Sequence, residues 1–109
     1  MQHFMRLRPE PFRMIGSGLK TFELRLFDEK RKQIALGDEI VFTCTEGDAA
    51  PLTCRVIGLF PFASFDALYR TIPLLRCGYT EETVCKASPR DMEEYYSGEE
   101  IRKSGVLAI

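Results

Sequence analysis

The sequence predicts a single α+β domain, mainly β, built as a small barrel of strands with helices over its openings. Three observations predict it. The chain has 109 residues, which is the usual length of one domain. Alternating apolar segments and helical segments are expected in the order β, α, β, β, β, α, α, α, β. The middle strands follow one another through short loops, as in an antiparallel meander, and leave the first and last strands to close it.

The first elements are a strand and a short helix. Residues 2–7 alternate apolar and polar side chains at period two, which is typical of a half-buried strand. Pro9 and Pro11 end this strand, and both suit the first turn of a helix. We therefore expect a short helix over residues 11–17, with Gly18 at its C-terminal end.

Residues 20–26 form the clearest predicted strand. Its alternating side chains divide into two faces, with Phe22, Leu24 and Leu26 on one and Thr21, Glu23 and Arg25 on the other. After a charged loop, a turn at residues 36–38 leads into a β-rich run over 39–45. Residues 52–62 are long enough to be its return strand in a hairpin, with a bulge or bend at Gly58.

The C-terminal part is predicted to be helical until its last strand. Ser64 is expected to cap a helix over residues 65–72. Two further helices are expected to begin after Ser88 and Ser97, because both serines open capping signatures. The closing residues 106–109 are wholly apolar, which suits the centre of a sheet rather than its edge.

Charge excludes an overall basic protein but leaves a local basic region. The formal net charge is -1, with hydrophobic residues at 45% and charged residues at 28%. Residues 1–32 carry eight cations against four anions, and residues 33–109 carry seven against twelve. A polyanion would therefore meet the N-terminal third, unless these charges are only a solvated surface.

The cysteines and the single histidine give no metal site. No two of Cys44, Cys54, Cys77 and Cys85 form a C-x-x-C, and His3 is the only histidine, so we expect neither a metal nor another cofactor. No apolar run approaches the ~20 residues that span a bilayer. We expect a cytoplasmic protein with free thiols and no membrane contact.

Several common catalytic sites are excluded by spacing. Residues 16–21 look superficially like a phosphate loop, but Leu19 separates Gly18 from Lys20, and a strand follows where that motif needs a helix. A serine triad and a zinc deaminase are excluded as well, because the sequence lacks the motifs of both and has only one histidine.

The remaining pattern is Gly18-x-Lys20-x-x-Glu23-x-Arg25, where a helix turns into a strand. Glu23 and Arg25 share a face at a spacing of roughly 7 Å, so they can pair or converge on one ligand. Lys20 begins the strand, and its flexible stem can curl toward the same face. The alternative is an exposed lysine beside a surface ion pair of little energetic weight.

This pattern, in its helix-to-strand setting, resembles the ASCH domain, a relative of the PUA domain, in its small single-domain bacterial type. The resemblance extends over the Leu36-Gly37-Asp38 turn, the Ser64-Phe65 helix start, Tyr95-Tyr96-Ser97 and the closing Gly105-Val-Leu-Ala-Ile109. It implies a PUA-like β-barrel with a cleft for RNA or a nucleotide-like ligand. Lys20, Thr21, Glu23 and Arg25 would mark that cleft.

Aromatic rings are expected to stack on bases of a bound RNA. The candidates for this role are Tyr79, Tyr95 and Tyr96. Tyr95 and Tyr96 are consecutive on an expected helix, so at most one of them should face the cleft while the other packs on the core.

An enzymatic branch of the ASCH family hydrolyses N4-acetylcytidine with a lysine, a threonine three residues later and a distant glutamate. Lys20 matches the lysine, but the third position after it is Glu23, and no spacing selects Glu81 or Glu82 as the distant acid. If the chain is an amidohydrolase, Lys20 is its base and Glu23 or Thr21 supports it. A module that binds RNA or a nucleotide is the first hypothesis, the amidohydrolase the second, and a protein-binding accessory domain the third.

Overall fold

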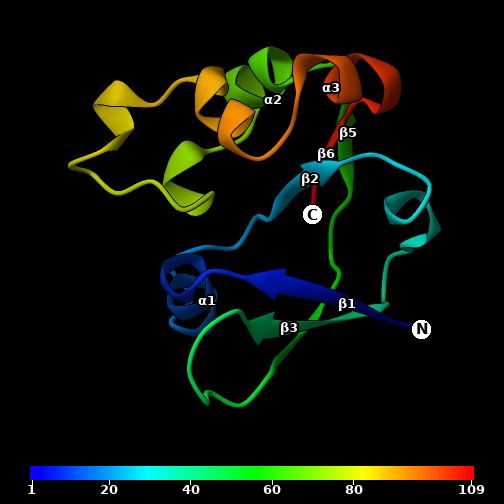
Figure 1. Ribbon diagram of the computed structural model, residues 1–109, viewed down its shortest axis with the longest axis vertical. Coiled ribbons are helices and arrows are strands. Elements are labelled where there is room, and N and C mark those ends of the chain that lie inside the picture. Colours follow the sequence, from blue (N-terminus) through cyan, green and yellow to red (C-terminus); the bar gives the residue numbers. More distant parts are fainter.

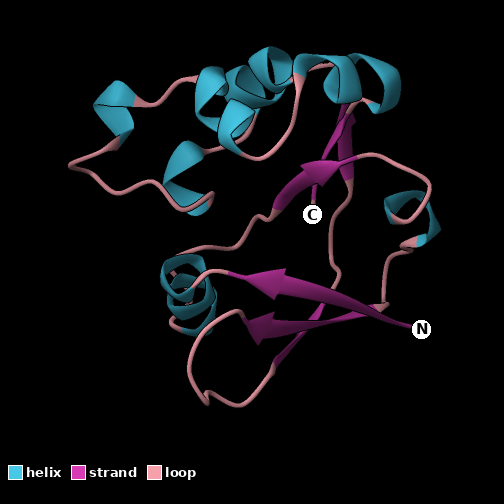
Figure 2. Ribbon diagram, in the orientation of Figure 1, coloured by secondary structure: helices cyan, strands magenta, loops and turns pink.

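The computed structural model describes residues 1–109 and contains strands, α-helices and short 3-10 helices (Figure 1). The strands are β1 (Gln2–Leu7), β2 (Leu24–Leu26), β3 (Glu39–Cys44), β4 (Leu52–Arg55), β5 (Phe60–Phe62) and β6 (Val106–Ala108). The α-helices are α1 (Pro9–Gly16), α2 (Phe65–Thr71) and α3 (Gly98–Ser104). The 3-10 helices are η1 (Arg31–Gln33), η2 (Leu74–Arg76), η3 (Val84–Lys86) and η4 (Pro89–Glu94). The predicted α+β class is confirmed, and Figure 2 shows how the two kinds of element are distributed.

The first sheet has the strand order β1-β3-β4. β1 runs parallel to β3, and β3 pairs with β4 as the antiparallel hairpin that the sequence predicted, with Phe42 opposite Leu52. Every second side chain of β1 is buried, namely His3, Met5 and Leu7. The opposite face of β1 is turned to solvent and carries Phe4, which is 60% exposed.

The second sheet has the order β2-β6-β5, so the apolar last strand is the central one, as predicted. All three residues of β6 are buried. β2 is shorter than the expected strand over residues 20–26. The amides of Thr21 and Phe22 both donate to the carbonyl of Arg76, so these residues do not join the ladder.

The prediction of one return strand over residues 52–62 is wrong. The segment divides into β4 and β5, which belong to different sheets. The chain bends between them around Gly58, where an added Cβ would lie 2.6 Å from the ring of Phe60. A side chain at this position would collide with that ring, so glycine permits the bend.

Helices cover one face of the second sheet, in the upper layer of Figure 1. The serine caps are confirmed: the side chain of Ser64 accepts from the amide of Ala67, and Ser88 and Ser97 form capping boxes. The element after Ser88 is a 3-10 helix, η4, rather than an α-helix. The first helix begins at Pro9, before the predicted start.

Each sheet has its own hydrophobic core. Leu68 of α2 packs on Val106 of β6 in one core, and Phe12 of α1 joins Phe42 of β3 in the other. The polar residues that are buried are His3, Lys20 and Glu23. The closure of the two sheets into one barrel stays a prediction.

Candidate functional site

The G-x-K-x-x-E-x-R segment leaves α1 through a tight turn at Gly18. The φ angle of Gly18 is 83°, in the left-handed region that glycine adopts without steric penalty. The amide of Lys20 then donates to the carbonyl of Met14 at 3.0 Å. The amide and the carbonyl of Glu23 pair with Ile109 at 3.0 and 2.9 Å. Backbone hydrogen bonds therefore hold the segment before β2 begins.

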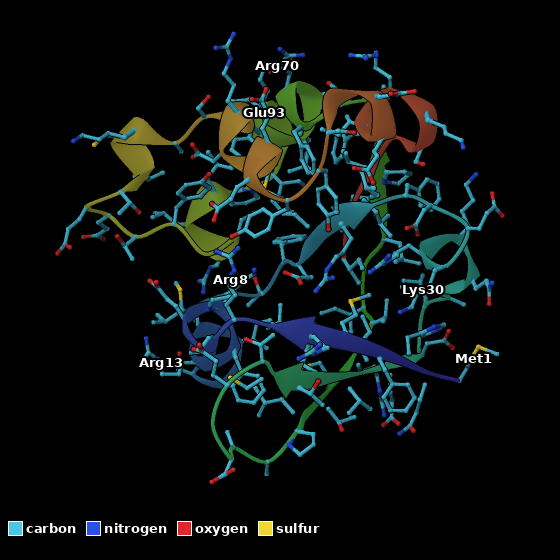
Figure 3. All side chains as sticks on the ribbon, viewed as in Figure 1. Met1, Arg8, Arg13, Lys30, Arg70 and Glu93 are labelled. Atoms are coloured by element: carbon cyan, nitrogen blue, oxygen red, sulfur yellow. The ribbon has the colours of Figure 1, made fainter.

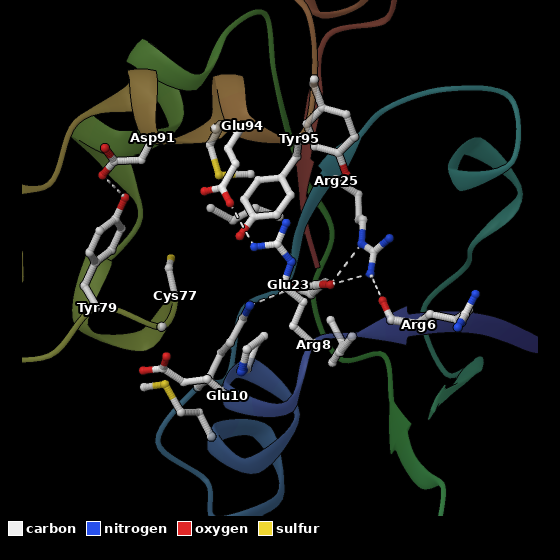
Figure 4. Close-up of a pocket in the computed structure, with 18 of the residues that line it drawn as sticks. Arg6, Arg8, Glu10, Glu23, Arg25, Cys77, Tyr79, Asp91, Glu94 and Tyr95 are labelled. Carbon is white, nitrogen blue, oxygen red and sulfur yellow. Dashed lines mark hydrogen bonds and ion pairs between the residues drawn. The ribbon is translucent and has the colours of Figure 1, made fainter. Parts of the chain in front are cut away.

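The side chains of Lys20 and Arg25 both contact that of Glu23, and we call these three residues the charged trio (Figure 4). Nζ of Lys20 lies 2.8 Å from Oε1 of Glu23, and Nη2 of Arg25 lies 2.7 Å from Oε2. Nη2 of Arg25 also donates to the carbonyl of Arg6 at 3.0 Å. Lys20 and Glu23 are 9% and 7% exposed, so this is not the surface ion pair considered from the sequence. The role of the trio in binding stays a prediction.

The two cations determine the charge state of Glu23. Burial by itself would raise the pKa of this carboxyl, but the charges and hydrogen bonds of Lys20 and Arg25 outweigh it and hold the pKa below its ordinary value. Both carboxylate oxygens are occupied as acceptors. An ammonium has three N–H groups and a guanidinium five, so the trio has donors left over and one net positive charge. It can donate to acceptor atoms of a ligand.

The trio lies in the wall of a cleft of about 520 Å³. The lining comes from β1, α1 and β2 on one side and from α2, η4 and residues 77–79 on the other. The charged lining residues are Arg6, Arg8, Lys20 and Arg25 with Glu10, Glu23, Asp91 and Glu94. Cations and anions balance, so the lining as a whole has no net charge. The volume lies in the range of small-molecule sites.

Tyr79 is held in the cleft by a chain of hydrogen bonds. Its hydroxyl donates to Oδ2 of Asp91 at 2.6 Å and lies 2.8 Å from the hydroxyl of Tyr69. Because the Tyr79 hydroxyl donates its hydrogen bond to Asp91, it accepts a hydrogen bond from the Tyr69 hydroxyl. Burial, and then the hydrogen bond to Asp91, raise the pKa of Tyr79 well above its ordinary value. Both Tyr69 and Tyr79 line the cleft as neutral phenols at pH 7.

The prediction that at most one of Tyr95 and Tyr96 faces the cleft is wrong, because both line it. η4 is a 3-10 helix that ends at Glu94, and Tyr95 is its C-cap, so α-helical spacing does not apply. One face of the Tyr96 ring is covered by Phe65, with the centroids 6.2 Å apart and the planes at 15°. Tyr95 is 51% exposed.

Thr21 lies outside this cleft. It is exposed and lines a second cavity of about 440 Å³, which also has Lys20 and Glu23 in its wall. The other residues of that cavity are mainly apolar, among them Phe22 and Phe60. The structure therefore places Tyr79, Tyr96 and the trio together in the cleft, and Thr21 in the second cavity with Lys20 and Glu23.

The sequence did not indicate that Tyr69, Asp91, Arg8 and Glu94 line the cleft. Tyr69 lies within the helix expected over residues 65–72, and Asp91 within the capping signature that Ser88 opens, so neither pattern indicated a site. Arg8 and Glu94 are 86 positions apart, and Nη1 of Arg8 donates to Oε1 of Glu94 at 2.8 Å. No local pattern could have indicated that pair. The capping box around Asp91 is the signal that could have placed η4 at a defined position.

Cys77 also lines the cleft. Burial raises the pKa of its thiol to about 11, so at neutral pH it is a protonated thiol and a poor nucleophile. The structure contains no group of three or more His, Cys, Asp or Glu side chains placed to hold a metal ion. None of its helices combines the length and the apolar character that a membrane span requires.

Comparison with known proteins finds one family and several similar solved structures, two of which are PH0355 and PF0455. A sequence model described as "ASCH domain" matches residues 5–109. The crystal structure of hypothetical protein PH0355 is similar with a TM-score of 0.80 and 33% identity, over 100% of this chain and 95% of that one. The solution NMR structure of protein PF0455 from Pyrococcus furiosus gives 0.74 and 29%, over 100% and 94%. A search of curated proteins gave no match.

Proposed function

Because this chain belongs to the ASCH domain family, we propose that its cleft binds RNA or a nucleotide, with the charged trio as the polar end of the site. Lys20 and Arg25 donate to oxygen or nitrogen acceptors of the ligand. Glu23 is their common partner and keeps both cations in place. In this proposal the module binds its ligand and does not react with it.

One observation carries this proposal: buried hydrogen-bond donors and several aromatic rings line the same cleft. Single-stranded nucleic acid is bound by cations on its polar groups and by aromatic rings against its bases. Tyr79 and Tyr96 supply rings, and Lys20 and Arg25 supply donors. Stacking is worth about 1–3 kcal/mol for each base, so one or two rings account for a substantial share of the affinity.

Binding to a labelled single-stranded RNA octamer and to the four nucleoside 5′-monophosphates tests the proposal. Lys20→Met removes one donor but leaves Glu23 paired with Arg25, so it suits the test better than a change at Glu23. We expect it to weaken binding about tenfold or more, the worth of a charged hydrogen bond. Lys103→Met is the matched control, because Lys103 is exposed on α3 and outside the cleft.

Melting temperatures of both variants show whether the fold survives. Tyr79→Leu removes a ring and should also weaken binding, whereas Tyr79→Phe keeps the ring and should bind more tightly than Tyr79→Leu. If neither RNA nor any monophosphate binds to the parent protein, the proposal is wrong. If Lys20→Met and Lys103→Met bind the RNA and the monophosphates equally well, the trio is not part of the binding site.

Hydrolysis of N4-acetylcytidine is the alternative function, and it predicts an activity that a binding module lacks. Lys20 borders the cleft beside a carboxylate, which is the placement that this alternative needs. Its assisting group would be Glu23 or Thr21, and Thr21 lines the second cavity, which Lys20 and Glu23 also border. We expect no cytidine above background from purified protein. Cytidine release that Lys20→Met abolishes would establish the amidohydrolase instead.

A further inference from the structure

Arg8 and Glu94 face each other across the mouth of the cleft (Figure 4). Their side chains are 58% and 59% exposed and 2.8 Å apart. The guanidinium of Arg8 also lies over the ring of Tyr95, 5.0 Å from its centroid. Arg8 follows β1 and Glu94 ends η4, so this contact joins the two walls of the cleft.

The backbone of Arg8 is held in place, while its side chain is not bound to the helix that Arg8 caps. Arg8 precedes Pro9 and caps α1 with φ and ψ of -64° and 160°, the extended conformation that a following proline favours. Its side chain makes no cap hydrogen bond. The guanidinium can therefore turn between partners without any movement of β1 or α1.

The balanced charge of the lining raises the question of where an anionic group could bind. Glu23 is buried between two cations, and Asp91 is held by Tyr79 and by the amide of Ser88. Glu10 holds no cation. Glu94 is thus the one lining anion that occupies an exposed cation. An exposed pair of this kind is worth about 0–1 kcal/mol, so a better anion can displace it.

We infer that Arg8 binds a phosphate group of the ligand at the mouth of the cleft, and that Glu94 weakens this binding by competing for the same guanidinium. The inference rests on the proposed function, and it adds that the ligand carries a phosphate at its exposed end. A guanidinium presents a fork of N–H donors that matches phosphate oxygens as well as a carboxylate. Tyr95 supports Arg8 in both states, because its ring contacts the guanidinium rather than the carboxylate.

The experiment compares ligands with and without phosphate on matched variants. Glu94→Gln removes the competing charge, Arg8→Gln removes the phosphate contact, and Glu93→Gln is the control. Glu93 neighbours Glu94 but does not line the cleft, and Figure 3 shows it on the outer side of the helical layer, away from Arg8. Calorimetry measures the affinities of the four nucleosides, their 5′-monophosphates and inorganic pyrophosphate. The Nε–H signal of Arg8 in a nitrogen-15 spectrum reports the anion directly.

We expect Glu94→Gln to tighten monophosphate binding about two- to fivefold, which corresponds to the loss of an exposed pair. Nucleoside affinities should stay unchanged. Glu93→Gln should match the parent for every ligand. Arg8→Gln should remove the difference between each monophosphate and its nucleoside.

The two proposals fail in different ways. If no nucleotide or RNA binds, but pyrophosphate shifts the Arg8 signal and binds more tightly to Glu94→Gln, the proposed function is wrong and the phosphate contact stands. If pyrophosphate shifts Arg8 in neither the parent nor Glu94→Gln, the phosphate contact is wrong, whatever the nucleosides do. Equal monophosphate affinities for Glu94→Gln and Glu93→Gln also overturn it.

Discussion

At the scale of single residues, Glu23 is the common partner on which Lys20 and Arg25 both depend. Glu23→Gln leaves Lys20 and Arg25 without their counter-charge, 9% and 16% exposed in the side chain. We expect it to lower the free energy of unfolding by about 3–5 kcal/mol, because breaking one partner out of a buried ion pair has this cost. Urea denaturation followed by circular dichroism measures it.

Glu94→Gln is the control for this change, since it breaks an ion pair in which both side chains are more than half exposed. The free energy of unfolding should fall by no more than about 1 kcal/mol. If the free energy of unfolding falls by similar amounts in the two variants, burial of the trio contributes little to stability. The difference between them measures what burial adds.

Asp38 provides a pH-dependent contribution away from the cleft. The hydrogen bonds from His3 at 2.8 Å and from the amide of Ala35 hold the pKa of Asp38 at about 2, against an ordinary 3.8. Because the folded pKa is the lower one, this stabilisation is full above about pH 4 and is lost as the pH falls toward 2. Asp38→Asn should therefore flatten the decline of stability between those values.

Urea denaturation at a series of pH values tests this for Asp38→Asn beside the parent protein. Other carboxyl groups, Glu23 included, titrate in both proteins, so only the difference between the two curves reports Asp38. A difference that stays constant from pH 5 to pH 2 would show that the partners of Asp38 do not shift its pKa.

Local alternation was enough to predict part of the site, because the contacts in it are short-range in sequence. Glu23 and Arg25 share a face as a direct result of strand geometry, and Lys20 is close enough to reach them. Arg8 and Glu94 meet only because the whole chain folds, and their spacing of 86 residues leaves no local pattern. Thr21 lies outside β2 for a related reason: its amide donates to the carbonyl of Arg76, which is far away in the sequence.

At the scale of elements, the junction between α3 and β6 depends on Gly105. Its φ is 71° and its ψ is -172°, a region that is essentially restricted to glycine. A Cβ at this position would also lie 3.0 Å from the carbonyl oxygen of Phe62 in β5. We expect Gly105→Ala to lower the free energy of unfolding by about 2–4 kcal/mol, since backbone strain and steric contact combine.

Gly47→Ala separates these two causes. Gly47 has a φ of 79°, but a Cβ there would meet nothing within 4 Å. Its replacement should cost only the conformational penalty of about 1–2 kcal/mol. Thermal denaturation of both variants gives the comparison, and a loss for Gly47→Ala as large as that for Gly105→Ala would contradict the role of the Phe62 contact.

Helix starts were easier to predict than strand partners. Ser64, Ser88 and Ser97 each cap an element through contacts within three residues, so the sequence alone contains the signal. The pairing of β5 depends on β6, which lies far away in the chain. Residues 52–62 therefore looked like one strand, although β4 pairs with β3 and β5 pairs with β6. Alternation identifies a strand but not its sheet.

At the scale of the whole molecule, the charged trio lies where the two sheets meet. Arg25 belongs to β2 of the second sheet, and its hydrogen bond to the carbonyl of Arg6 reaches β1 of the first. The same residues that face the cleft therefore also join the two sheets. Changes in the trio should affect stability and binding at once, which is why each binding experiment above includes a melting temperature or a control outside the trio.

The charge balance of the molecule predicts a weak dependence of RNA binding on salt. The net charge is -1 and the cleft lining is neutral, so few phosphates can exchange their counterions for protein cations. With one or two phosphate contacts to a single strand, affinity should fall only about three- to sevenfold from about 50 to about 200 mM salt. Anisotropy of a labelled RNA octamer at several potassium chloride concentrations measures the slope. A fall of a hundredfold or more would place the RNA on those cations of the N-terminal third that lie outside the cleft, because only a row of unpaired cations gives so steep a dependence.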